Sequence, residues 1–383
     1  MFWKRRTYLD VAAGMSGNPS SPHEEGRKAK KMLEDARTDI ARLLEVQADD
    51  VIFTSGATEA NALAILGTVH SRQKAVGSQK IHMLYLPSAH ASIVENMKLA
   101  SERGVNIEAL PIKDGRVDCE KLKALLRPET RLVSMDAVCG ETGVVWNTRE
   151  VANVLITHVG HPMSHMDTRP LLHVDASQSP LTEKITRAHF GADTLALDAS
   201  KVGDVRGIGA LIAHRTIPLQ PLYRGGGQER GLRAGSEAPE LAQKFAAALR
   251  AAALNRESFR ASAELARKQL IETITKIPNV FVNEGPLAGG QAPNILNLSL
   301  FGRDTDYLVA LLDEAGFAVS TRSACETDSV EGSRAVYELT GDPEKARATL
   351  RISWGHDIRP RELTHFARSL MKAVAFIDNN GRG

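Results

Sequence analysis

A lysine and an aspartate each close a short apolar run, where either could act on a bound ligand. Lys201 ends the segment LDASK, and Asp175 ends the segment HVD. A buried amine has a lowered pKa and can form a Schiff base, and a carboxylate beyond a buried strand can keep a pyridinium nitrogen protonated. The alternatives are a lysine whose stem lies along the surface and an aspartate that caps a helix.

A turn of small residues follows another apolar run and precedes a helical pattern. Its sequence is TSGATEAN, residues 54–61. The first N–H groups of a helix are unpaired and point at an anion. Gly56 and Ala57 would let a phosphate come close, and Thr58 adds a hydroxyl group. The alternative is an ordinary turn capped by a threonine.

The third cysteine, Cys325, lies in the polar stretch Ser320–Ser333, between a strand pattern and a helix pattern. A thiol on such a loop is placed to attack a ligand, and Arg322 nearby would favour the thiolate. An inert buried thiol is the alternative, and it is our interpretation of Cys119 and Cys139.

A single arginine, Arg351, interrupts the apolar strand pattern Leu350–Trp354. A guanidinium group in such a place can bind a substrate carboxylate through two parallel hydrogen bonds. A structural ion pair is the alternative interpretation.

Short apolar runs alternate with helical patterns from residue 51 onward. We expect strands at Val51–Thr54, Ile81–Leu86, Arg131–Val138, Leu172–Val174, Thr194–Leu197 and Ala210–Ala213. We expect helices at Glu59–Val69, Ser92–Ser101 and Arg149–His158, and an amphipathic helix over residues 32–43 before them. This alternation favours an α/β fold with a mostly parallel sheet and helices on both faces.

The pattern changes after about residue 237 and becomes α+β. We expect a long helix at Leu241–Ile274 and a closing helix at Glu362–Ile377. We expect strands at Val280–Val282, Ile295–Leu300, Ala318–Ser320 and Leu350–Trp354. The predicted organisation is a large α/β domain, residues 17–238, and a smaller α+β domain formed by residues 1–16 and 239–383.

The composition excludes several classes of protein. The chain has 383 residues, 48 of them basic and 46 acidic, which favours neither nucleic acid nor a membrane as a partner. No long apolar run follows the basic N-terminus, and three scattered cysteines form no disulfide framework, so we expect a cytoplasmic protein. His158, His161 and His165 have no cysteine or carboxylate cluster beside them, so we expect an exposed loop and no metal.

The order of these motifs resembles that of the cysteine desulfurases, fold-type I pyridoxal-phosphate enzymes of the class V aminotransferase group. The resemblance runs from Tyr8 to the last helix. It rests on GNPSS (17–21), TSGATEAN (54–61), HVDASQ (173–178), SK (200–201), RGGGQERGLRAGS (224–236), APNILN (292–297), SAC (323–325) and LRISW (350–354). The long segment between Cys325 and Arg351 resembles the group with an extended cysteine loop, which is linked to iron–sulfur cluster assembly.

The resemblance implies a role for each motif. Lys201 holds pyridoxal 5'-phosphate as a Schiff base and Cys325 takes the sulfur as a persulfide, so that L-cysteine leaves as L-alanine. The other implied contacts are Asp175 with the pyridine nitrogen, Gln178 near the ring oxygen, His90 stacked on the ring, Ala57, Thr58 and Ser200 with the phosphate, Ser236 with the phosphate of the other subunit, and Arg351 with the substrate carboxylate. The family implies a homodimer that passes its sulfur to an acceptor such as an iron–sulfur scaffold protein. The alternatives are a selenocysteine lyase or another class V enzyme, and a degenerate homologue that acts as a binding subunit.

Several positions depart from the family's pattern. Cys139 and Gly140 replace two asparagines, Ser200 replaces a histidine, Asp198 replaces a phosphate-binding serine, and Arg322 replaces a glycine; the N-terminal stretch before residue 17 is also short. We expect an active enzyme whose cofactor is held loosely. We also expect that Gly140→Asn restores a contact and tightens retention of the cofactor.

Overall fold

The computed structural model describes residues 6–76, 81–158, 169–285, 290–321 and 332–380. Its main sheet has seven strands in the order β1-β9-β8-β7-β6-β2-β3. The strands are β1 (Val51–Thr54), β2 (His82–Tyr85), β3 (Asn106–Ala109), β6 (Thr130–Asp136), β7 (Leu171–Asp175), β8 (Thr194–Asp198) and β9 (Gly209–Ala213). All neighbours are parallel except β9, which is antiparallel to both β1 and β8. The prediction of a mostly parallel sheet is confirmed.

Helices cover both faces of this sheet because its strands are apolar on both sides. In β1, Ile52 packs with Ala60 of α2 (Ala57–Val76). Its neighbour Phe53 belongs instead to a cluster with Ile40 and Phe245. Ile40 lies in α1 (Glu24–Leu44) and Phe245 in α7 (Pro239–Ile274). Alternate residues of one strand therefore face helices on opposite sides.

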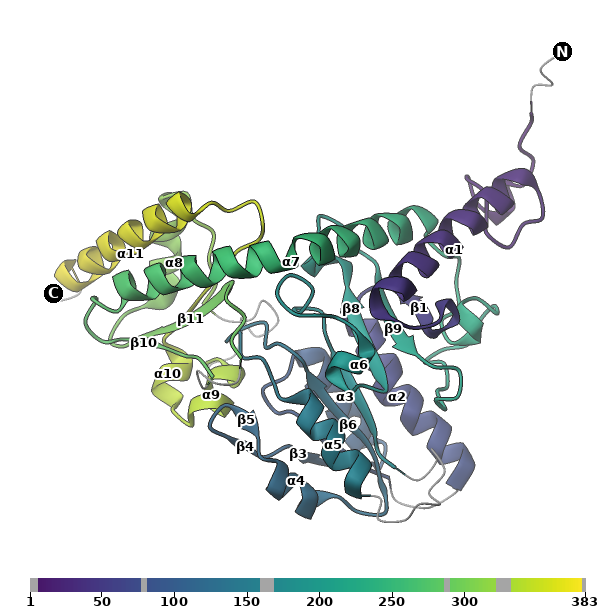
Figure 1. The fold of residues 1–383 in the computed structure, drawn as a ribbon, viewed down its shortest axis with the longest axis horizontal. Coiled ribbons are helices and arrows are strands. Elements are labelled where there is room, and N and C mark those ends of the chain that lie inside the picture. The colour runs from purple at the N-terminus through teal and green to yellow at the C-terminus, as the bar shows by residue number, and fades with distance from the viewer. Residues whose placement is uncertain (1–5, 77–80, 159–168, 286–289, 322–331, 381–383) are drawn as a thin grey trace.

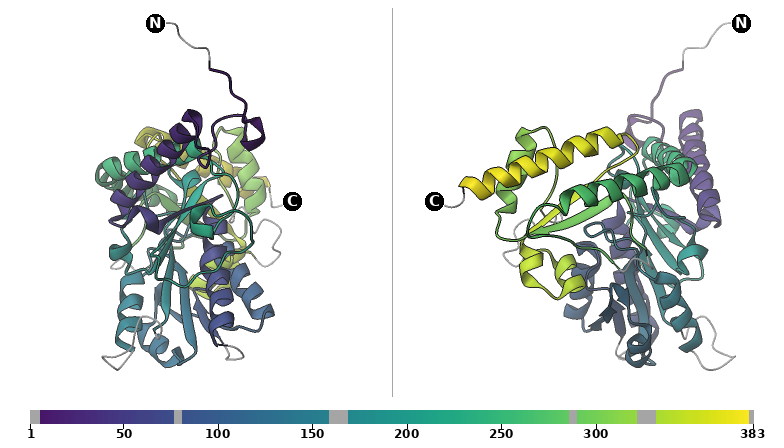
Figure 2. Two further views of the ribbon diagram at one scale, coloured as in Figure 1. Left: turned by 90° about the vertical axis from the view of Figure 1, so that its right-hand side faces the viewer. Right: turned by 60° about the vertical axis from the view of Figure 1, so that its left-hand side comes forward.

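The remaining elements of the large unit surround this sheet (Figures 1 and 2). They are α3 (Ala91–Glu102), α4 (Cys119–Leu125), α5 (Thr148–His158), α6 (Arg187–Phe190) and the hairpin of β4 (Ile112–Lys113) and β5 (Arg116–Val117). The apolar pattern predicted none of β3, β4, β5, α4 and α6, which are short or carry charged residues that break it.

The C-terminal part has a three-stranded antiparallel sheet in the order β10-β11-β12. Its elements are β10 (Val280–Val282), β11 (Ile295–Leu300), α8 (Thr305–Glu314), α9 (Arg334–Thr340), α10 (Pro343–Arg347), β12 (Thr349–Ser353) and α11 (Pro360–Asn380). The strand predicted at Ala318–Ser320 is wrong: only Ser320 pairs, in an isolated bridge to Arg351.

The long helix α7 belongs to two hydrophobic cores. Phe245 and Leu249, in its first half, pack in the core of the large sheet. Phe259 and Leu270, in its second half, pack with β11, β12 and α11 in a separate C-terminal core. Figures 1 and 2 show α7 running from α1 at one end to α11 at the other. The helix therefore joins the two cores without an intervening linker.

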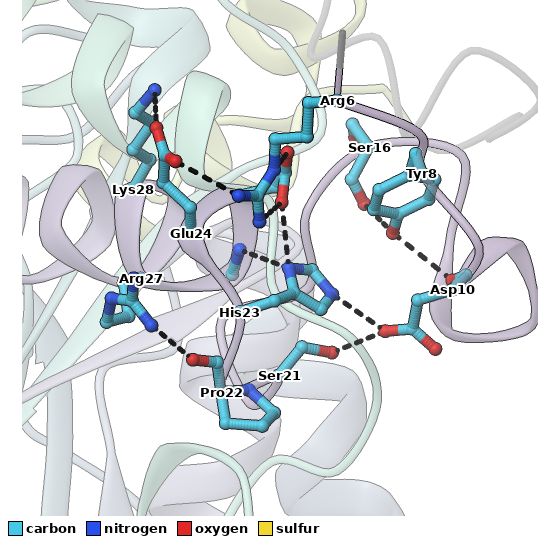
Figure 3. Close-up of polar contacts among 12 residues, drawn as sticks. Arg6, Tyr8, Asp10, Ser16, Ser21, Pro22, His23, Glu24, Arg27 and Lys28 are labelled. Carbon is cyan, nitrogen blue, oxygen red and sulfur yellow. Dashed lines mark hydrogen bonds and ion pairs between the residues drawn. The ribbon is translucent and has the colours of Figure 1, made fainter. Parts of the chain in front are cut away.

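Residues 6–16 lie against the beginning of α1 (Figure 3). The Tyr8 hydroxyl donates to the Gly14 carbonyl at 3.0 Å, and the Asp10 carboxylate accepts from Ser21 Oγ at 2.8 Å and lies 2.9 Å from His23 Nε2. Arg6 forms an ion pair with Glu25. These contacts are all local, and the assignment of residues 1–16 to the smaller domain stays a prediction.

None of the helices in the described residues is long and apolar enough to cross a membrane.

Candidate active site

A cavity of about 250 Å³ opens where β6, β7 and β8 end. Parallel strands place their carboxyl ends at one edge of a sheet, which is where α/β folds bind ligands. The residues that line it are Ala57, Thr58, His90, Asp136, Val138, Gly140, Asp175, Ser177, Gln178, Asp198, Ser200 and Lys201. A second cavity of about 130 Å³ shares His90, Asp136, Gly140, Gln178 and Lys201 with it and adds Arg334 and Arg351. The structure thus brings together every predicted site residue except Ser236 and Cys325.

The end of β7 holds Asp175 in a fixed position. Its Oδ1 accepts hydrogen bonds from the backbone N–H of Ser177 at 2.9 Å and from Ser177 Oγ at 2.6 Å. Its Oδ2 accepts from Asn61 Nδ2, on α2, at 2.7 Å. The side chain is buried. Three donors stabilise the carboxylate where a bound pyridinium ring could use its charge.

A chain of hydrogen bonds runs from buried Asp175 to His90, which is exposed. Asn61 Nδ2 also donates to Ser92 Oγ at 2.8 Å, and this hydroxyl lies 2.8 Å from His90 Nδ1. The Ser92 backbone N–H also donates to His90 Nδ1, so a neutral His90 ring carries its proton on Nε2. On the other side, Asn61 Oδ1 lies 2.8 Å from Nε2 of His173, whose pKa is lowered to about 4 by burial. Neutral His173 therefore donates this bond and fixes the orientation of the amide.

The role of Asn61 was not predicted, although the residue belongs to the motif TSGATEAN. Asn61 follows Ala57 by four residues on α2, so both lie on the face of the helix that meets the cavity. That spacing was the available signal. Ser92 offered none, because its contacts depend on how α2 and α3 pack together.

Lys201 ends a short 3₁₀ turn, Ala199–Lys201, directly after β8. It lines both cavities, and its role as the Schiff-base lysine stays a prediction. The expectation of a buried amine is wrong, because Lys201 is exposed in this single chain. The turn itself is anchored by Ala199, which is fully buried.

The carboxylate of Asp198, at the end of β8, lies against the N-terminus of α2. Its Oδ2 accepts the Ala57 backbone N–H at 2.9 Å, and its Oδ1 accepts from the Ser200 N–H at 2.9 Å and from Ser200 Oγ at 2.7 Å. A β-carbon added at Gly56 would lie 3.0 Å from the same Oδ2. The residues present therefore fit the ring of a pyridoxal cofactor, at Asp175 and Lys201, better than they fit its phosphate.

A carboxyl group that the sequence analysis missed, Asp136, lies beside Asp175. The two residues are paired across β6 and β7, and Asp136 lines both cavities. Burial, reinforced by the charge of Asp175, raises the pKa of Asp136 to about 8, so the group is largely protonated at neutral pH. Among the described residues its Oδ1 has no hydrogen-bond partner. An aspartate that ends an apolar run, as in SMD, was the available signal.

Two arginines line the second cavity, and both follow Cys325 in the chain. Arg351, on β12, donates to the Gly140 carbonyl at 3.2 Å, and Arg334, at the start of α9, donates to the Pro87 carbonyl. Their guanidinium groups give this cavity a positive charge that suits a carboxylate ligand.

Gln178 fills the space beside Gly140. A β-carbon added at Gly140 would lie 2.8 Å from Gln178 Nε2 and 3.2 Å from its Cγ. Gln178 thus occupies space that a side chain at position 140 would need. A side chain introduced at Gly140 must displace Gln178 before it can make any new contact.

The cysteines differ in what the structure says of them. Cys325 lies outside the described residues. Ser320, which precedes it, forms a β-bridge with Arg351, and Arg334, which follows it, lines the second cavity. Burial raises the pKa of the Cys139 thiol to about 12, and burial also raises the pKa of Cys119. Neither of these two thiols is a thiolate at neutral pH.

Two other predictions lie away from the described cavities. Ser236 is exposed and lines neither cavity of its own chain, so its contact with a second subunit stays a prediction. His161 and His165 lie outside the described residues, and within those residues no group of three or more metal-binding side chains occurs.

Comparison with known proteins extends over nearly the whole chain. The model of the family Aminotransferase class-V matches residues 7–366. Cysteine desulfurase IscS 1 of Archaeoglobus fulgidus is 31% identical over 340 residues, which are 88% of this chain and 85% of the relative. The mitochondrial cysteine desulfurase of Arabidopsis thaliana is also 31% identical, over 94% of this chain and 76% of the relative.

Solved structures give the same result. A NifS-like protein superimposes with a TM-score of 0.84 at 25% identity, covering 94% of this chain and 92% of its own. DndA from Streptomyces lividans has a TM-score of 0.71 at 30% identity, covering 90% and 93%. SspA in complex with cysteine also has a TM-score of 0.71, at 27% identity, covering 88% and 90%.

Proposed function

This chain belongs to the class V aminotransferase family and, within it, to the cysteine desulfurases, and from that premise we propose how its residues divide the reaction. Pyridoxal 5'-phosphate, held on Lys201, is the proposed cofactor, and when bound it supplies the electron sink. The single observation that carries the proposal is the pair of adjoining cavities. One gathers Lys201 and Asp175, and the other adds two guanidinium groups suited to an amino-acid carboxylate.

The chain's own groups bind the substrate and move its proton. Arg351 takes the carboxylate of L-cysteine, because its guanidinium lines the second cavity beside Lys201. Nε2 is the nitrogen of His90 that can exchange a proton with the substrate, because Nδ1 is already bonded to Ser92. Asp175 is held in place by hydrogen bonds from Asn61 and Ser177.

Cys325 is the proposed sulfur acceptor. In the overall exchange the Cβ–S bond of L-cysteine breaks and an S–S bond to Cys325 forms, so that L-alanine and one protein persulfide result. Cys325 lies five residues beyond Ser320, which pairs with Arg351, and five residues span at most about 17 Å. The chain length therefore allows Cys325 to reach the second cavity. The remaining cysteines are unsuitable because their thiols stay protonated.

The proposed assembly is a homodimer in which Ser236 of each chain completes the phosphate site of the other. A sulfur-acceptor protein, such as an iron–sulfur scaffold, is the proposed recipient, and the cytoplasm is the proposed location. The name IscS on the archaeal relative supports an assembly role of this kind.

The test is incubation of the cofactor-loaded protein with L-cysteine, with L-alanine and protein-bound persulfide assayed together. We expect equal amounts in a single turnover, loss of the persulfide in Cys325→Ser, and no loss in the matched variant Cys119→Ser. Borohydride reduction followed by mass spectrometry should locate the cofactor on Lys201. Persulfide that persists in Cys325→Ser would assign the acceptor role to another cysteine.

A further inference from the structure

The donors expected to hold a phosphate are already bonded to a side chain of this protein. The first N–H of α2, at Ala57, donates to Asp198 Oδ2. The N–H and hydroxyl of Ser200 both donate to Asp198 Oδ1. Of the three residues assigned to the phosphate, only Thr58 keeps a hydroxyl that is not committed to Asp198.

The helix N-terminus favours Asp198 for the same reason that it would favour a phosphate. Unpaired N–H groups and the helix dipole stabilise one negative charge there, and α2 is long enough, at 20 residues, to present both. Glu59, in the first turn, also accepts the Ser55 N–H, but Arg233 and Tyr223 contact its carboxylate. Asp198 has no ion-pair partner among the described residues.

A phosphate that enters this cavity must therefore displace Asp198 from its donors or lie beside an uncompensated carboxylate. Two negative charges in adjacent positions repel each other strongly when bulk water does not surround them. The ring part of the cavity is not affected, because Asp175 is held by Asn61 and Ser177 and makes none of these contacts. The buried, unpartnered Oδ1 of Asp136 independently indicates that this part of the cavity takes a polar ligand.

We propose that Asp198 acts as an internal anion which competes with the phosphate of the cofactor, so that the site accepts unphosphorylated pyridoxal about as well as pyridoxal 5'-phosphate. The hydroxymethyl group of pyridoxal is neutral and can donate a hydrogen bond to Asp198, whereas a phosphate dianion has no proton to donate. This inference rests on the proposed function, in which Lys201 binds the aldehyde of either compound. It names a ligand class for the site and gives a physical reason for the expected loose cofactor.

The experiment compares the two aldehydes in five full-length proteins, the parent and four variants. Each protein is equilibrated with a series of concentrations, reduced with borohydride, and the adduct on Lys201 is quantified by peptide mass spectrometry. The variants are Asp198→Asn, which removes the charge and keeps an acceptor, and Asp198→Ser, which also opens the space. The matched control is Asp204→Asn, which removes an exposed charge that lines neither cavity. Lys201→Ala supplies the background.

We expect the parent protein and Asp204→Asn to bind the two aldehydes within about threefold of each other. Asp198→Ser should bind pyridoxal 5'-phosphate about tenfold or more tightly than the parent, with Asp198→Asn between them, and pyridoxal binding should not tighten in either. Thermal melting and circular dichroism confirm that each variant is folded.

Equal tightening for both aldehydes, or none for the phosphorylated one, would overturn the role of Asp198 and leave the proposed function intact. A Lys201 adduct that is absent from every protein, the opened Asp198→Ser site included, would overturn the proposed function and the inference together.

Discussion

The ends of β7 and β8 carry the same three residues and put them to different uses. Asp175-Ala176-Ser177 and Asp198-Ala199-Ser200 both read Asp-Ala-Ser. In each, Oδ1 of the aspartate accepts the N–H and the hydroxyl of the serine two residues on, and Oδ2 accepts a donor from α2. The donor is the Asn61 side chain for Asp175 and the Ala57 backbone for Asp198.

The difference between the two aspartates lies in their surroundings. Asp175 is 5% exposed and is part of a hydrogen-bonded chain that reaches His90 and His173. Asp198 is half-buried and meets the open N-terminus of a helix. In both segments the nearby serine holds Oδ1 of the aspartate. The tertiary contact decides whether the charge of the carboxylate serves a bound ring or takes the place of a bound anion.

The largest expected effect is on turnover, at the first of these aspartates. Asp175→Asn keeps the shape of the side chain but removes the charge that a pyridinium nitrogen requires, so we expect L-alanine production to fall by about a hundredfold or more. The measurement is the rate at saturating cofactor and cysteine. Asp204→Asn is the control. A rate within a few fold of the parent would mean that the two Asp-Ala-Ser segments have been assigned the wrong way round.

The next effect is on the pH dependence of stability, through Asp136 beside Asp175. In the cofactor-free protein its pKa is raised from 3.8 to about 8, so the folded state keeps a proton that the unfolded chain loses. Stability should therefore fall as pH rises from about 4 to 8, with a slope of up to about 1.4 kcal/mol per pH unit, and level off above that. Asp136→Asn should remove this slope. Urea unfolding between pH 5 and 9 measures it, and parallel curves for the two proteins would show that Asp136 ionises normally.

Asn61 tests the hydrogen-bonded chain that distinguishes Asp175 from Asp198. Asn61→Ala leaves Asp175, Ser92 and His173 each short of a buried partner, and we expect a loss of about 2–4 kcal/mol in the free energy of unfolding. Asn96→Ala removes one bond to the Ser92 carbonyl from a half-buried site and should cost about 1 kcal/mol or less. Similar losses in the two variants would mean that Asn61 is an ordinary packing residue.

The smallest effect concerns Gly140. A new side chain at position 140 must first displace Gln178. The cost of this displacement should nearly cancel the gain in cofactor retention that the sequence predicted. We expect retention through dialysis to change by less than about threefold in Gly140→Asn, and to improve only in the double variant with Gln178→Ala. A clear gain in the single variant would show that Gln178 moves at little cost.

The sequence predicted the strands that hold the site because each is an apolar run ended by a polar residue. Thr54, Asp175 and Asp198 all stand at such ends, and the structure places all three at one edge of the sheet. A helix pattern after Ser333 predicted the region of α9, whereas α8 and α10 were missed. The five-residue α10 is short and charged, and its Lys345 carbonyl accepts a hydrogen bond from Ser299 of β11.

The contacts between site residues were less predictable than their presence. Nothing in the segment LDASK indicates that Asp198 reaches across to Ala57, 141 residues earlier in the chain. The depth at which Asp136 is buried was equally hidden, because it depends on helices and loops from both cores. The resemblance carried by the motifs identified the reaction, and only the fold showed which charges face one another.

The stiffness of the helix α7 bears on the distance between Lys201 and Arg351. At 36 residues it is about 54 Å long, with its single proline at the first position and no glycine. A helix of this kind resists bending, and it is fixed in the core of the large sheet at one end and in the core that carries Arg351 at the other. We expect it to act as a strut that keeps the gap between Lys201 and Arg351 constant. If these two residues bind the substrate as proposed, selection by substrate length depends on stiffness, because an amino acid must match a span that does not adjust to it.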